Sequence, residues 1–438
     1  MRYVLNVVYL ALILFASPWL VYAAIRKQKY RAGWSEKFFG RVLVRPGIRP
    51  CAWFHAVSVG EVNLLEPLLK KMAATQPHVE CVISTTTKAG FELAQKKFAA
   101  YRVFYCPLDF SWAVSQALRR IRPDVLVLAE LELWPNLILA ASRAGVRVAV
   151  VNARLSARSF AGYRRLRWLT RRVLRVIDLV AAQTQEYADR FVKLGARPEC
   201  VHVTGSVKFD GARTERNNPA TLRLSQAAGF RPDDIVFLAG STQAGEEQLA
   251  LDTYRTLAAD HPCLRLVLVP RHPERFDEVA QLLARSAIPY QRRSRLEIDG
   301  ANPQARVLLV DTIGELGAWW GTALLAFVGG SMGSRGGQNM IEPAAYGAAV
   351  SFGPHTQNFR DVVAQLLHRQ AAVVVLNGAD LTAWARRCLD EPAYATTIGD
   401  RARQCVLDQR GATDRTIERL VKFGIEPQSI NCPPRHAA

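Results

Sequence analysis

The sequence predicts two doubly wound α/β domains that face each other across a cleft, preceded by one N-terminal transmembrane helix. An uncharged apolar run opens the chain, and short apolar runs then alternate with amphipathic helical segments. This alternation restarts after a polar stretch near residues 208–231. Apolar strands separated by helices are typical of parallel sheets covered on both faces. With 438 residues, the chain is long enough to build two cores.

These observations divide the chain into four parts. The predicted limits are 1–26 for the anchor, 27–215 for the first domain, 216–424 for the second domain and 425–438 for a disordered tail. In doubly wound sheets, ligands bind at the carboxyl ends of the strands. Functional side chains are therefore expected directly after the predicted strands.

The anchor is predicted from hydropathy and flanking charge. Residues 3–25 carry no charge and are numerous enough to span a bilayer as a helix. Arg26, Lys27, Lys29 and Arg31 follow the run, whereas only Arg2 precedes it. This asymmetry predicts an uncleaved anchor with the rest of the chain in the cytoplasm. A cleaved signal peptide is the alternative, but the run is long and the charge lies on the wrong side.

The strands follow from short apolar runs. In the first domain they are expected at 51–58, 79–84, 103–106, 124–130, 146–152 and 178–183. In the second domain they are expected at 234–240, 263–270, 306–311, 323–330, 348–353 and 371–376. Segments with helical periodicity fill the intervals between them.

Charge and cysteine content restrict the class of protein. The net charge of +19 comes from 57 Lys and Arg against 38 Asp and Glu, which favours anionic partners such as acidic lipid, phosphorylated substrates or nucleic acid. A basic but otherwise ordinary surface is the alternative. The eight cysteines include no CxxC pair, as in a reduced cytosolic protein without a disulfide framework or zinc site.

Carboxylates follow two strands of the first domain. Glu61 lies in the first turn of the helix after the first strand, where it could act as a general base or merely favour the helix dipole. Glu130 and Glu132 follow the fourth strand directly. Burying a carboxylate costs free energy, which favours a functional role for these two residues. Capping of the helix that begins at Pro135 is the alternative.

Basic side chains mark two further segments of the first domain. Lys208 closes this domain and could stabilise negative charge, although that signal is weak when taken alone. Residues 154–175 hold many arginines interleaved with aromatic and aliphatic residues. Of these, Arg158, Arg164, Arg165 and Arg171 are the candidates for an acceptor or membrane surface. Such a helix suits a membrane surface or a phosphorylated lipid, could grip nucleic-acid phosphates, or could be a solvated basic face.

Small, polar and basic residues recur at the strand ends of the second domain, where a phosphate could bind. The segments concerned contain Ser241, Thr242, Pro270, Arg271, Ile313, Gly314, Glu315, Gly330, Ser331, Asn339, Met340, Ile341 and Glu342, and of these Arg271 is well placed for a phosphate or carboxylate. Glycine in such turns lets the backbone approach a phosphate closely, and a carboxylate such as Glu342 can accept from ribose hydroxyls.

Several catalytic signatures are missing from the chain. It contains no GxxxxGK[ST], GxSxG or HExxH motif, no metal-spaced histidines and no DxD triplet. We therefore expect neither a metal nor another cofactor.

The ordered motifs resemble those of a known family. They are HAVSVGEV, TTTKAGFELA, AELELWPNLI, NARLSARSF, TGSVKFD, AGSTQAGEE, PRHPERF, DTIGELG, FVGGSMGSRGGQNMIEPAAYG and FGPHTQNF. Together they cover nearly the whole chain, and the sequence is similar to the 3-deoxy-D-manno-octulosonic acid (Kdo) transferases of lipopolysaccharide assembly. AELELWP departs slightly, since many members have a polar residue between the two glutamates.

The resemblance implies a GT-B fold and a metal-independent, inverting glycosyltransferase. The second domain would bind the donor CMP-Kdo through the residues named above, and the first would bind lipid IVA, the anionic lipid A precursor, at the membrane. Glu61 matches the family's general base, Lys208 its charge-stabilising lysine, and Glu130 or Glu132 its second carboxylate, with Glu130 the first choice. Nucleic acid is not an expected partner.

Two other functions fit the residues less well. One is a GT-B transferase that uses a UDP-sugar, and the other is a non-catalytic basic protein that binds anionic membrane or nucleic acid. The repeated anion sites at strand ends favour catalysis over mere binding.

Overall fold

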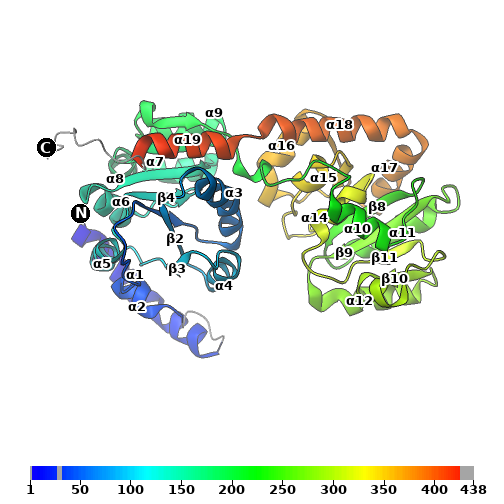
Figure 1. The fold of residues 1–438 in the computed structure, drawn as a ribbon, viewed down its shortest axis with the longest axis horizontal. Helices are drawn as coiled ribbons and strands as arrows, with labels where there is room; N and C mark the ends of the chain where they lie inside the picture. Colours follow the sequence, from blue (N-terminus) through cyan, green and yellow to red (C-terminus); the bar gives the residue numbers. More distant parts are fainter. Residues whose placement is uncertain (1, 27–31, 425–438) are drawn as a thin grey trace. The chain divides into compact units, whose positions relative to one another are not determined.

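The computed structural model describes residues 2–26 and 32–424 as two compact units (Figure 1). Unit 1 comprises Met1–Asp210 together with Arg410–Ala438, and unit 2 comprises Gly211–Gln409. The predicted tail at 425–438 and the basic flank at Lys27, Lys29 and Arg31 lie outside the described residues. Each unit contains a parallel sheet with helices on both sides, so the predicted pair of α/β domains is confirmed.

Unit 1 is built on a seven-stranded parallel sheet with the order β3-β2-β1-β4-β5-β6-β7. Its strands are β1 (Cys51–His55), β2 (Glu80–Thr85), β3 (Arg102–Tyr105), β4 (Val125–Ala129), β5 (Arg147–Ala153), β6 (Leu179–Ala182) and β7 (Val201–Val203). The strand order reverses its direction between β1 and β4, which pair along Ala52–His55 and Val125–Leu128. In doubly wound folds, such a switch point is where ligands bind.

Helices cover both faces of this sheet. They are α1 (Arg2–Arg26), α2 (Trp34–Phe39), α3 (Val59–Thr75), α4 (Lys88–Lys97), α5 (Ser111–Ile121), α6 (Pro135–Arg143), α7 (Ala157–Arg165), α8 (Arg167–Leu174), α9 (Gln185–Leu194), α19 (Ala412–Gly424), and the 3₁₀ turns η1 (Pro198–Cys200) and η2 (Val207–Phe209). Because side chains alternate along a strand, Trp53 packs into the core on one face and Phe54 into the core on the other. Both are fully buried.

Helix α1 replaces the predicted transmembrane span. Among the described residues, no helix combines the length and the apolar character that a membrane crossing requires, so the span predicted over 1–26 is not supported. Two polar residues within the apolar run, Asn6 and Tyr9, bind to unit 1. Asn6 is buried and hydrogen-bonds to Ser111, and Tyr9 donates to Asp109.

Helix α19 belongs to unit 1, although the sequence pattern placed it in the second domain. It packs against α3, β5 and β6 after the chain returns from unit 2 (Figure 1). Asp210 holds its beginning, because its carboxylate accepts from Gly411 N at 2.7 Å and from Thr413 N. Amphipathic periodicity shows that a helix has an apolar face but not which core that face covers.

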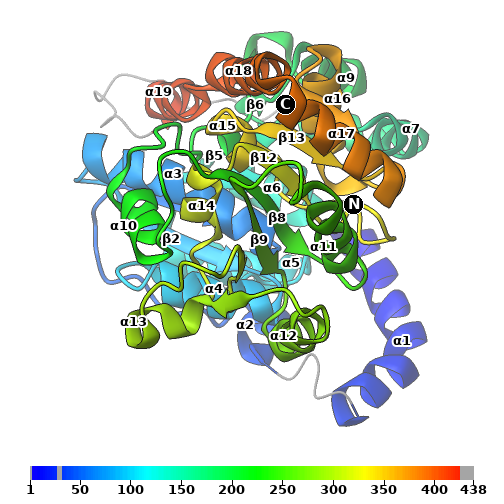
Figure 2. The ribbon, with the colours of Figure 1, turned by 90° about the vertical axis from the view of Figure 1, so that its right-hand side faces the viewer.

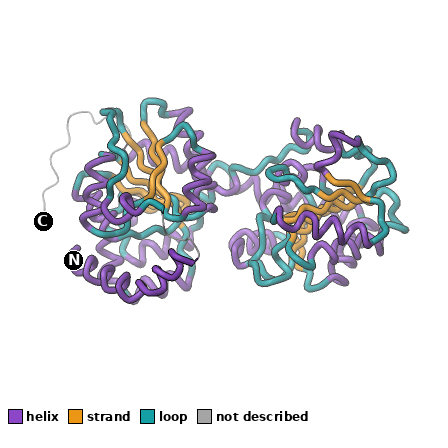
Figure 3. Tube along the Cα trace, turned by 90° about the horizontal axis from the view of Figure 1, so that it is seen from below, coloured by secondary structure: helices purple, strands orange, loops and turns teal. Residues whose placement is uncertain are grey.

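Unit 2 repeats the architecture with the strand order β10-β11-β9-β8-β12-β13-β14. Its strands are β8 (Ile235–Thr242), β9 (Leu264–Pro270), β10 (Tyr290–Arg292), β11 (Val307–Leu309), β12 (Leu325–Val328), β13 (Ala349–Phe352) and β14 (Ala372–Val374). The switch point of this sheet lies between β8 and β12, which pair in parallel. Figure 3 shows the strands of both units between helices.

The helices of unit 2 surround β8 and β9, which lie in the middle of the unit in Figure 2. They are α10 (Pro219–Ala227), α11 (Glu246–Leu257), α12 (Phe276–Arg285), α13 (Leu296–Asp299), α14 (Leu316–Trp319), α15 (Ile341–Ala345), α16 (Arg360–His368), α17 (Gly378–Asp390), α18 (Pro392–Gln409), and the 3₁₀ turns η3 (Pro273–Arg275), η4 (Arg293–Arg295), η5 (Trp320–Thr322) and η6 (Gln357–Phe359). Phe237, Leu266 and Phe327 form part of its core.

All twelve predicted strands are present, and the sequence missed β7 and β10. Both missed strands lie at an edge of their sheet and have only three residues. Their sequences, Val-His-Val and Tyr-Gln-Arg, are too short and too polar for an apolar run to indicate them.

Candidate functional site

Three carboxylates and one lysine gather at the strand ends of unit 1. Glu61 follows β1, whereas Glu130 and Glu132 lie in the segment 130–134 after β4, which we call the carboxylate loop. The charge of Glu130 acts on Glu61, and the charges of Glu61 and Glu130 act on Glu132, so the three groups are close neighbours. Lys208 joins them through an ion pair with Glu130. The structure thus brings together all four predicted catalytic candidates at the switch point.

Glu61 lies in the first turn of α3 and belongs to a capping box. The N-cap residue Ser58 accepts from the backbone N–H of Glu61, and its hydroxyl donates to Glu61 Oε1 at 2.9 Å. The backbone N–H of Val57 donates to Glu61 Oε2 at 2.8 Å. Burial raises the pKa of Glu61, those hydrogen bonds oppose the rise, and the charge of Glu130 adds to it. The carboxylate is therefore fixed in place and more basic than a free one.

Glu130 begins the carboxylate loop in a strained conformation. Its φ of 56° is left-handed, which is uncommon for a residue other than glycine. Its backbone N–H donates to Val151 O at 2.9 Å and holds the loop to β5. Its carboxylate accepts from Lys208 Nζ at 2.9 Å, and both side chains are partly exposed. The turn thus directs this side chain toward the lysine.

Glu132 has the most altered acidity of the three carboxylates. Burial and then the charge of Glu61 raise its pKa to about 7, although the indole of Trp134 opposes the rise by donating to Oε2 at 2.9 Å. The charge of Glu130 raises the pKa further. A carboxyl group with this pKa can take up or release a proton near neutral pH.

Behind the carboxylate loop lies a buried histidine that sequence reasoning left without a role. His55 is fully buried, and its Nδ1 lies 2.9 Å from Ser84 Oγ, which also accepts from Trp53 Nε1 at 2.7 Å. Burial lowers the pKa of His55 to about 4, so the ring is neutral at neutral pH. Its ring meets that of Trp134 edge-on at 6.4 Å. It therefore supports the loop as a neutral group.

Lys208 is positioned from two sides by residues that the sequence did not single out. Asn152, at the end of β5, is fully buried with a left-handed φ of 51°, and its Oδ1 accepts from Val207 N at 3.1 Å. Asp210, on the other side of Lys208, binds the beginning of α19. A polar residue in the otherwise apolar end of a strand was the available signal for Asn152.

The predicted basic surface occupies α7 and α8. Arg158, Arg164, Arg165 and Arg171 are all exposed, and none forms an ion pair with another described residue. Leu166 and Trp168 are exposed between them, at 53% and 64%. Charge and apolar surface therefore alternate on the same two helices, which suits an anionic interface.

In unit 2, Arg271 is the predicted residue best placed to meet an anion. It lies just after β9, is exposed, and its guanidinium makes no ion pair or hydrogen bond within the described part of the chain. Pro270 ends β9 beside it and is buried. Ser241, at the end of β8, has a left-handed φ of 56°. Thr242 is buried and donates to Glu247 Oε1 at 2.7 Å, so its hydroxyl is engaged within the protein.

The loop containing Gly330 and Ser331 holds a carboxylate of the protein itself. Glu246 is almost fully buried, and its Oε1 accepts from Ser331 N and Met332 N, both at 2.9 Å. Its Oε2 accepts from Gly330 N at 2.7 Å and from Gln243 N at 2.8 Å. The amide groups of Gly330 and Ser331, predicted to face the donor, are therefore occupied. The glycine-rich pattern indicated an anion site, but an internal anion fills it.

The loop after β11 separates into an exposed part and a fixed part. Ile313 is 79% exposed, and Gly314 has a left-handed φ of 90°. Glu315 accepts from Arg293 Nε and Nη2, each at 2.9 Å, and from Thr312 Oγ1 at 2.7 Å. Burial would raise the pKa of Glu315, but these hydrogen bonds outweigh it and the pKa is lowered. Arg293 thus fixes the turn that presents Ile313 and Gly314.

The segment Asn339–Glu342 leads into α15. Asn339 donates to Glu342 Oε1 at 2.9 Å and accepts from Ile341 N at 3.1 Å. Burial raises the pKa of Glu342, and the hydrogen bond from Asn339 opposes the rise. Met340 and Ile341 are buried and pack the turn against the core. Glu342 is thereby held with one oxygen engaged.

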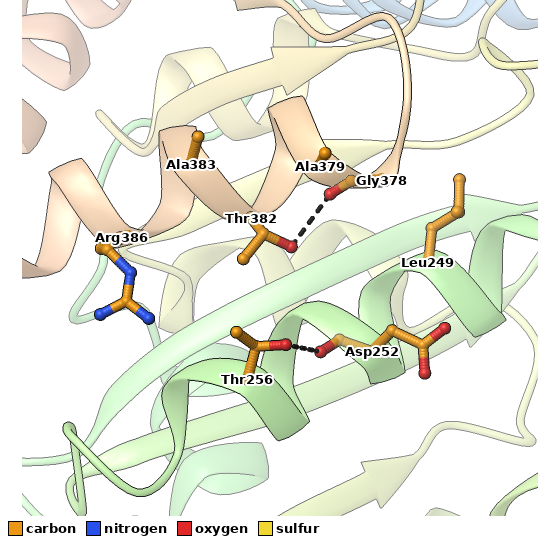
Figure 4. A pocket seen from close by; sticks show the side chains of 8 residues that line it. All are labelled: Leu249, Asp252, Thr256, Gly378, Ala379, Thr382, Ala383 and Arg386. Atoms are coloured by element: carbon orange, nitrogen blue, oxygen red, sulfur yellow. Dashed lines mark hydrogen bonds between the residues drawn. The ribbon is translucent and has the colours of Figure 1, made fainter.

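A separate groove lies on unit 2 between α11 and α17, and Figure 4 shows the side chains that line it. It has a volume of about 550 Å³ and is lined by Leu249, Asp252, Thr256, Gly378, Ala379, Thr382, Ala383 and Arg386. None of the predicted donor-binding residues lines it. Thr382 donates to Gly378 O and Thr256 to Asp252 O within their own helices, as Figure 4 shows.

Possible metal ligands were also considered. Within residues 2–26 and 32–424, no three His, Cys, Asp or Glu side chains are grouped so that they could hold a metal ion.

Comparisons with known proteins identify similar sequences and folds. A family model described as 3-deoxy-D-manno-octulosonic-acid transferase (kdotransferase) matches residues 31–211. The 3-deoxy-D-manno-octulosonic acid transferase of Haemophilus influenzae is 32% identical over 427 residues, which cover 95% of this chain and 98% of that protein. The Bordetella pertussis enzyme of the same name is 36% identical over 414 residues, which cover 90% of this chain and 94% of that one.

Solved structures share the two-domain fold. Among them is the UDP-GlcNAc 2-epimerase from Neisseria meningitidis bound to UDP-GlcNAc, which is 14% identical with a TM-score of 0.58. The match covers 86% of this chain and 100% of that chain.

Proposed function

Because the chain belongs to the 3-deoxy-D-manno-octulosonic acid transferase family, we propose that it transfers Kdo from CMP-Kdo to lipid IVA in lipopolysaccharide assembly. The observation that carries this proposal is the group formed by Glu61, Glu130, Glu132 and Lys208 at the switch point of unit 1. Such a group supplies both a base and a cation for sugar transfer.

Glu61 is the proposed general base. It takes the proton from an acceptor hydroxyl as that oxygen attacks the anomeric carbon of Kdo, and CMP leaves from the opposite face with inversion. The raised pKa of Glu61 brings its basicity closer to neutral pH, where general base catalysis is most efficient. The fixed bonds from Val57 and Ser58 limit its motion during the proton transfer.

The other two carboxylates have separate proposed roles. Glu130 holds Lys208, and Lys208 offsets negative charge that develops as the bond to the phosphate breaks. Glu132, with a pKa of about 7, receives a proton near neutral pH and keeps the three carboxylates from being fully charged together. The structure supports this division because only Glu130 of the three accepts from the lysine in the described part of the chain.

Unit 2 is the proposed CMP-Kdo domain. Arg271, which has no ionic partner among the described residues, binds the phosphate or the Kdo carboxylate. Ile313, Gly314 and the segment Asn339–Glu342 bind the nucleoside, with Glu342 accepting from ribose hydroxyls. In contrast, Ser331 contributes by shaping the loop around Glu246 and not through its own amide.

The acceptor is proposed to approach from an anionic membrane. The exposed arginines of α7 and α8 provide charge for the phosphates of lipid IVA, and Trp168 provides an aromatic side chain for the interface. We therefore place the enzyme at the cytoplasmic face of the inner membrane.

A turnover assay tests the proposed function. The full-length protein is mixed with lipid IVA and freshly generated CMP-Kdo, and the lipid products are weighed by mass spectrometry. We expect a mass gain of one or more Kdo units and a loss of about 10²–10⁴-fold in kcat for Glu61→Gln. Normal turnover by a folded Glu61→Gln variant would contradict the role of Glu61.

The donor is tested separately by competition. CMP should inhibit the transfer and UDP should not. If UDP inhibited the transfer and CMP did not, the proposed CMP-linked donor would be wrong and a UDP-sugar would be indicated instead.

A further inference from the structure

Helix α1 hydrogen-bonds to Asp109 and to Asn136, which lies in the first turn of the helix that follows the carboxylate loop. We infer that Asn6 and Tyr9 are positioning residues for the carboxylate loop, acting through Asp109 and the beginning of α6. This inference rests on the proposed function, because it assigns a catalytic effect to residues that touch neither substrate. The residues Asn6, Tyr9, Asp109, Ser111 and Asn136 are called the docking cluster.

The beginning of α6 depends on a residue from elsewhere in the chain. A helix leaves its first backbone N–H groups without partners, and a side chain at the N-cap usually satisfies one of them. The N-cap residue of α6 is Trp134, which makes no such bond because an indole has no acceptor atom, and its N–H donates to Glu132. Asp109 supplies the cap instead. Its Oδ2 accepts from Asn136 N at 3.0 Å and its Oδ1 from Leu137 N at 2.8 Å.

Asp109 is in turn held by α1. Tyr9 donates its phenol O–H to Asp109 Oδ2 at 2.9 Å, and its ring packs edge-on against Phe110 at 6.0 Å. Asp109 is 4% exposed, and its main-chain oxygen accepts from Asn136 Nδ2 at 2.6 Å. A buried carboxylate needs several donors, and the phenol of α1 is one of only three that Asp109 has among the described residues.

Asn6 closes the docking cluster on the same face of α1. Its Nδ2 donates to Ser111 Oγ at 2.7 Å, and its Oδ1 accepts from Ser111 N at 3.0 Å. The Oδ1 atom also accepts from Asn136 Nδ2 at 3.4 Å. Asn6 therefore caps α5, as Asp109 caps α6, and a buried side chain of α1 reaches both helices.

The docking cluster is coupled to the site by a short, constrained path. Asn136 is two residues beyond Trp134, and Pro135 between them fixes one backbone torsion. Trp134 donates to the Glu132 carboxylate and packs against His55. A shift at the beginning of α6 therefore moves the indole N–H that holds the Glu132 carboxylate through a hydrogen bond. Misplacement of a catalytic group by about 1 Å can lower a rate about 100-fold.

The inference is tested with full-length Tyr9→Phe and Asn6→Ala, and with Tyr22→Phe as the control. Tyr22 is on the same helix but is 55% exposed. Hydrogen exchange is measured on peptides that cover 130–137, and kcat and KM are measured with lipid IVA and CMP-Kdo. Thermal unfolding and circular dichroism establish that the variants fold.

For Tyr9→Phe we expect the amides of Asn136 and Leu137 to exchange about ten-fold faster or more, because one hydrogen bond to a carboxylate is lost. We expect kcat to fall about ten-fold with an unchanged KM for the donor, since the loop and not unit 2 is disturbed. Asn6→Ala should act in the same direction, and Tyr22→Phe should change neither quantity.

Two results would overturn the inference. Unchanged exchange of 130–137 in both variants would mean that α1 does not hold the loop. Faster exchange with an unchanged kcat would mean that the docking cluster is structural only. If the wild-type protein transferred no Kdo, the proposed function would fail, whereas the exchange data would still decide whether α1 holds the loop.

Discussion

In unit 1, three carboxylates at the strand ends have few donors and lie near one another, whereas Glu246 at the switch point of unit 2 accepts four backbone N–H groups. Both sets follow a central strand of a parallel sheet. Their surroundings differ. The pKa of Glu61 and that of Glu132 are raised by burial, while Glu246 is fully engaged within its loop.

This difference separates a reactive carboxylate from a structural one. A carboxylate that is saturated by fixed donors has no lone pair to offer to a substrate, and its removal leaves those donors without partners. A carboxylate with few donors near like charges is less stable when ionised and more ready to accept a proton. Asp109 of unit 1 shows that a structural carboxylate can also have a raised pKa, because burial raises its pKa to about 6 although three hydrogen bonds oppose the rise.

The largest effect is expected when the saturated carboxylate is changed. In Glu246→Gln, one carboxylate oxygen becomes an amide that faces two N–H donors, which destabilises unit 2 by about 3 kcal/mol. Thermal unfolding measures the loss. The matched substitution Glu61→Gln should change stability by less than about 1 kcal/mol while it abolishes most turnover. Equal stability losses in the two variants would contradict the distinction between a structural Glu246 and a reactive Glu61.

A smaller effect is expected from the pH dependence of Glu132. Its pKa rises from an ordinary 4.5 to about 7 in the folded protein, mainly through burial. Between these values the folded state keeps a proton that the unfolded chain has lost. The stabilising contribution of Glu132 to the free energy of unfolding is therefore complete below pH 4.5 and is lost as the pH rises to about 7. Glu132→Gln should therefore gain stability relative to the wild type over this interval.

The expected gain is about 1–2 kcal/mol at pH 7.5, after allowance for solvent screening at a partly exposed group. Denaturant unfolding at several pH values measures it. The control is Glu274→Gln, whose side chain is 75% exposed. A stability difference between Glu132→Gln and the wild type that does not vary with pH would mean that Glu132 ionises normally in the folded state.

Much of this architecture could be predicted from the sequence. Apolar runs such as 124–130 and 263–270 stand out clearly in the sequence, and a strand is present at every position where such a run predicted one. Glu61, Glu130, Glu132 and Lys208 could be brought together because the carboxyl ends of parallel strands share one edge of a sheet. The family motifs then linked these residues to a reaction.

The remaining features depend on contacts between distant segments. No local pattern indicates that Asp109 caps α6 or that Asn6 caps α5, because each pair is separated by many residues. The loop at Gly330 resembles a phosphate site, and only the structure shows that Glu246 occupies it. Hydropathy likewise marked residues 3–25 as a span and overlooked the use of Asn6 and Tyr9 as docking groups.

The smallest effect concerns the carboxylate that attaches α19 to unit 1. Asp210 accepts from Gly411 N and Thr413 N, so Asp210→Asn replaces one acceptor with a donor and should cost about 1 kcal/mol. Asp210 is close to Lys208 in sequence, so we expect the substitution to disturb the lysine slightly and to lower kcat by a few-fold. Hydrogen exchange of peptides from α19 measures the loosening directly.

The matched control is Asp414→Asn, whose side chain is 65% exposed in its ion pair with Lys71. A surface pair of this kind contributes little, so exchange in α19 should stay at the wild-type rate. If both variants loosened α19 equally, its attachment would depend on the surface charge of the helix. If only Asp210→Asn does so, a carboxylate that accepts from the first backbone N–H groups holds the returning helix beside the catalytic lysine, as Asp109 holds the beginning of α6.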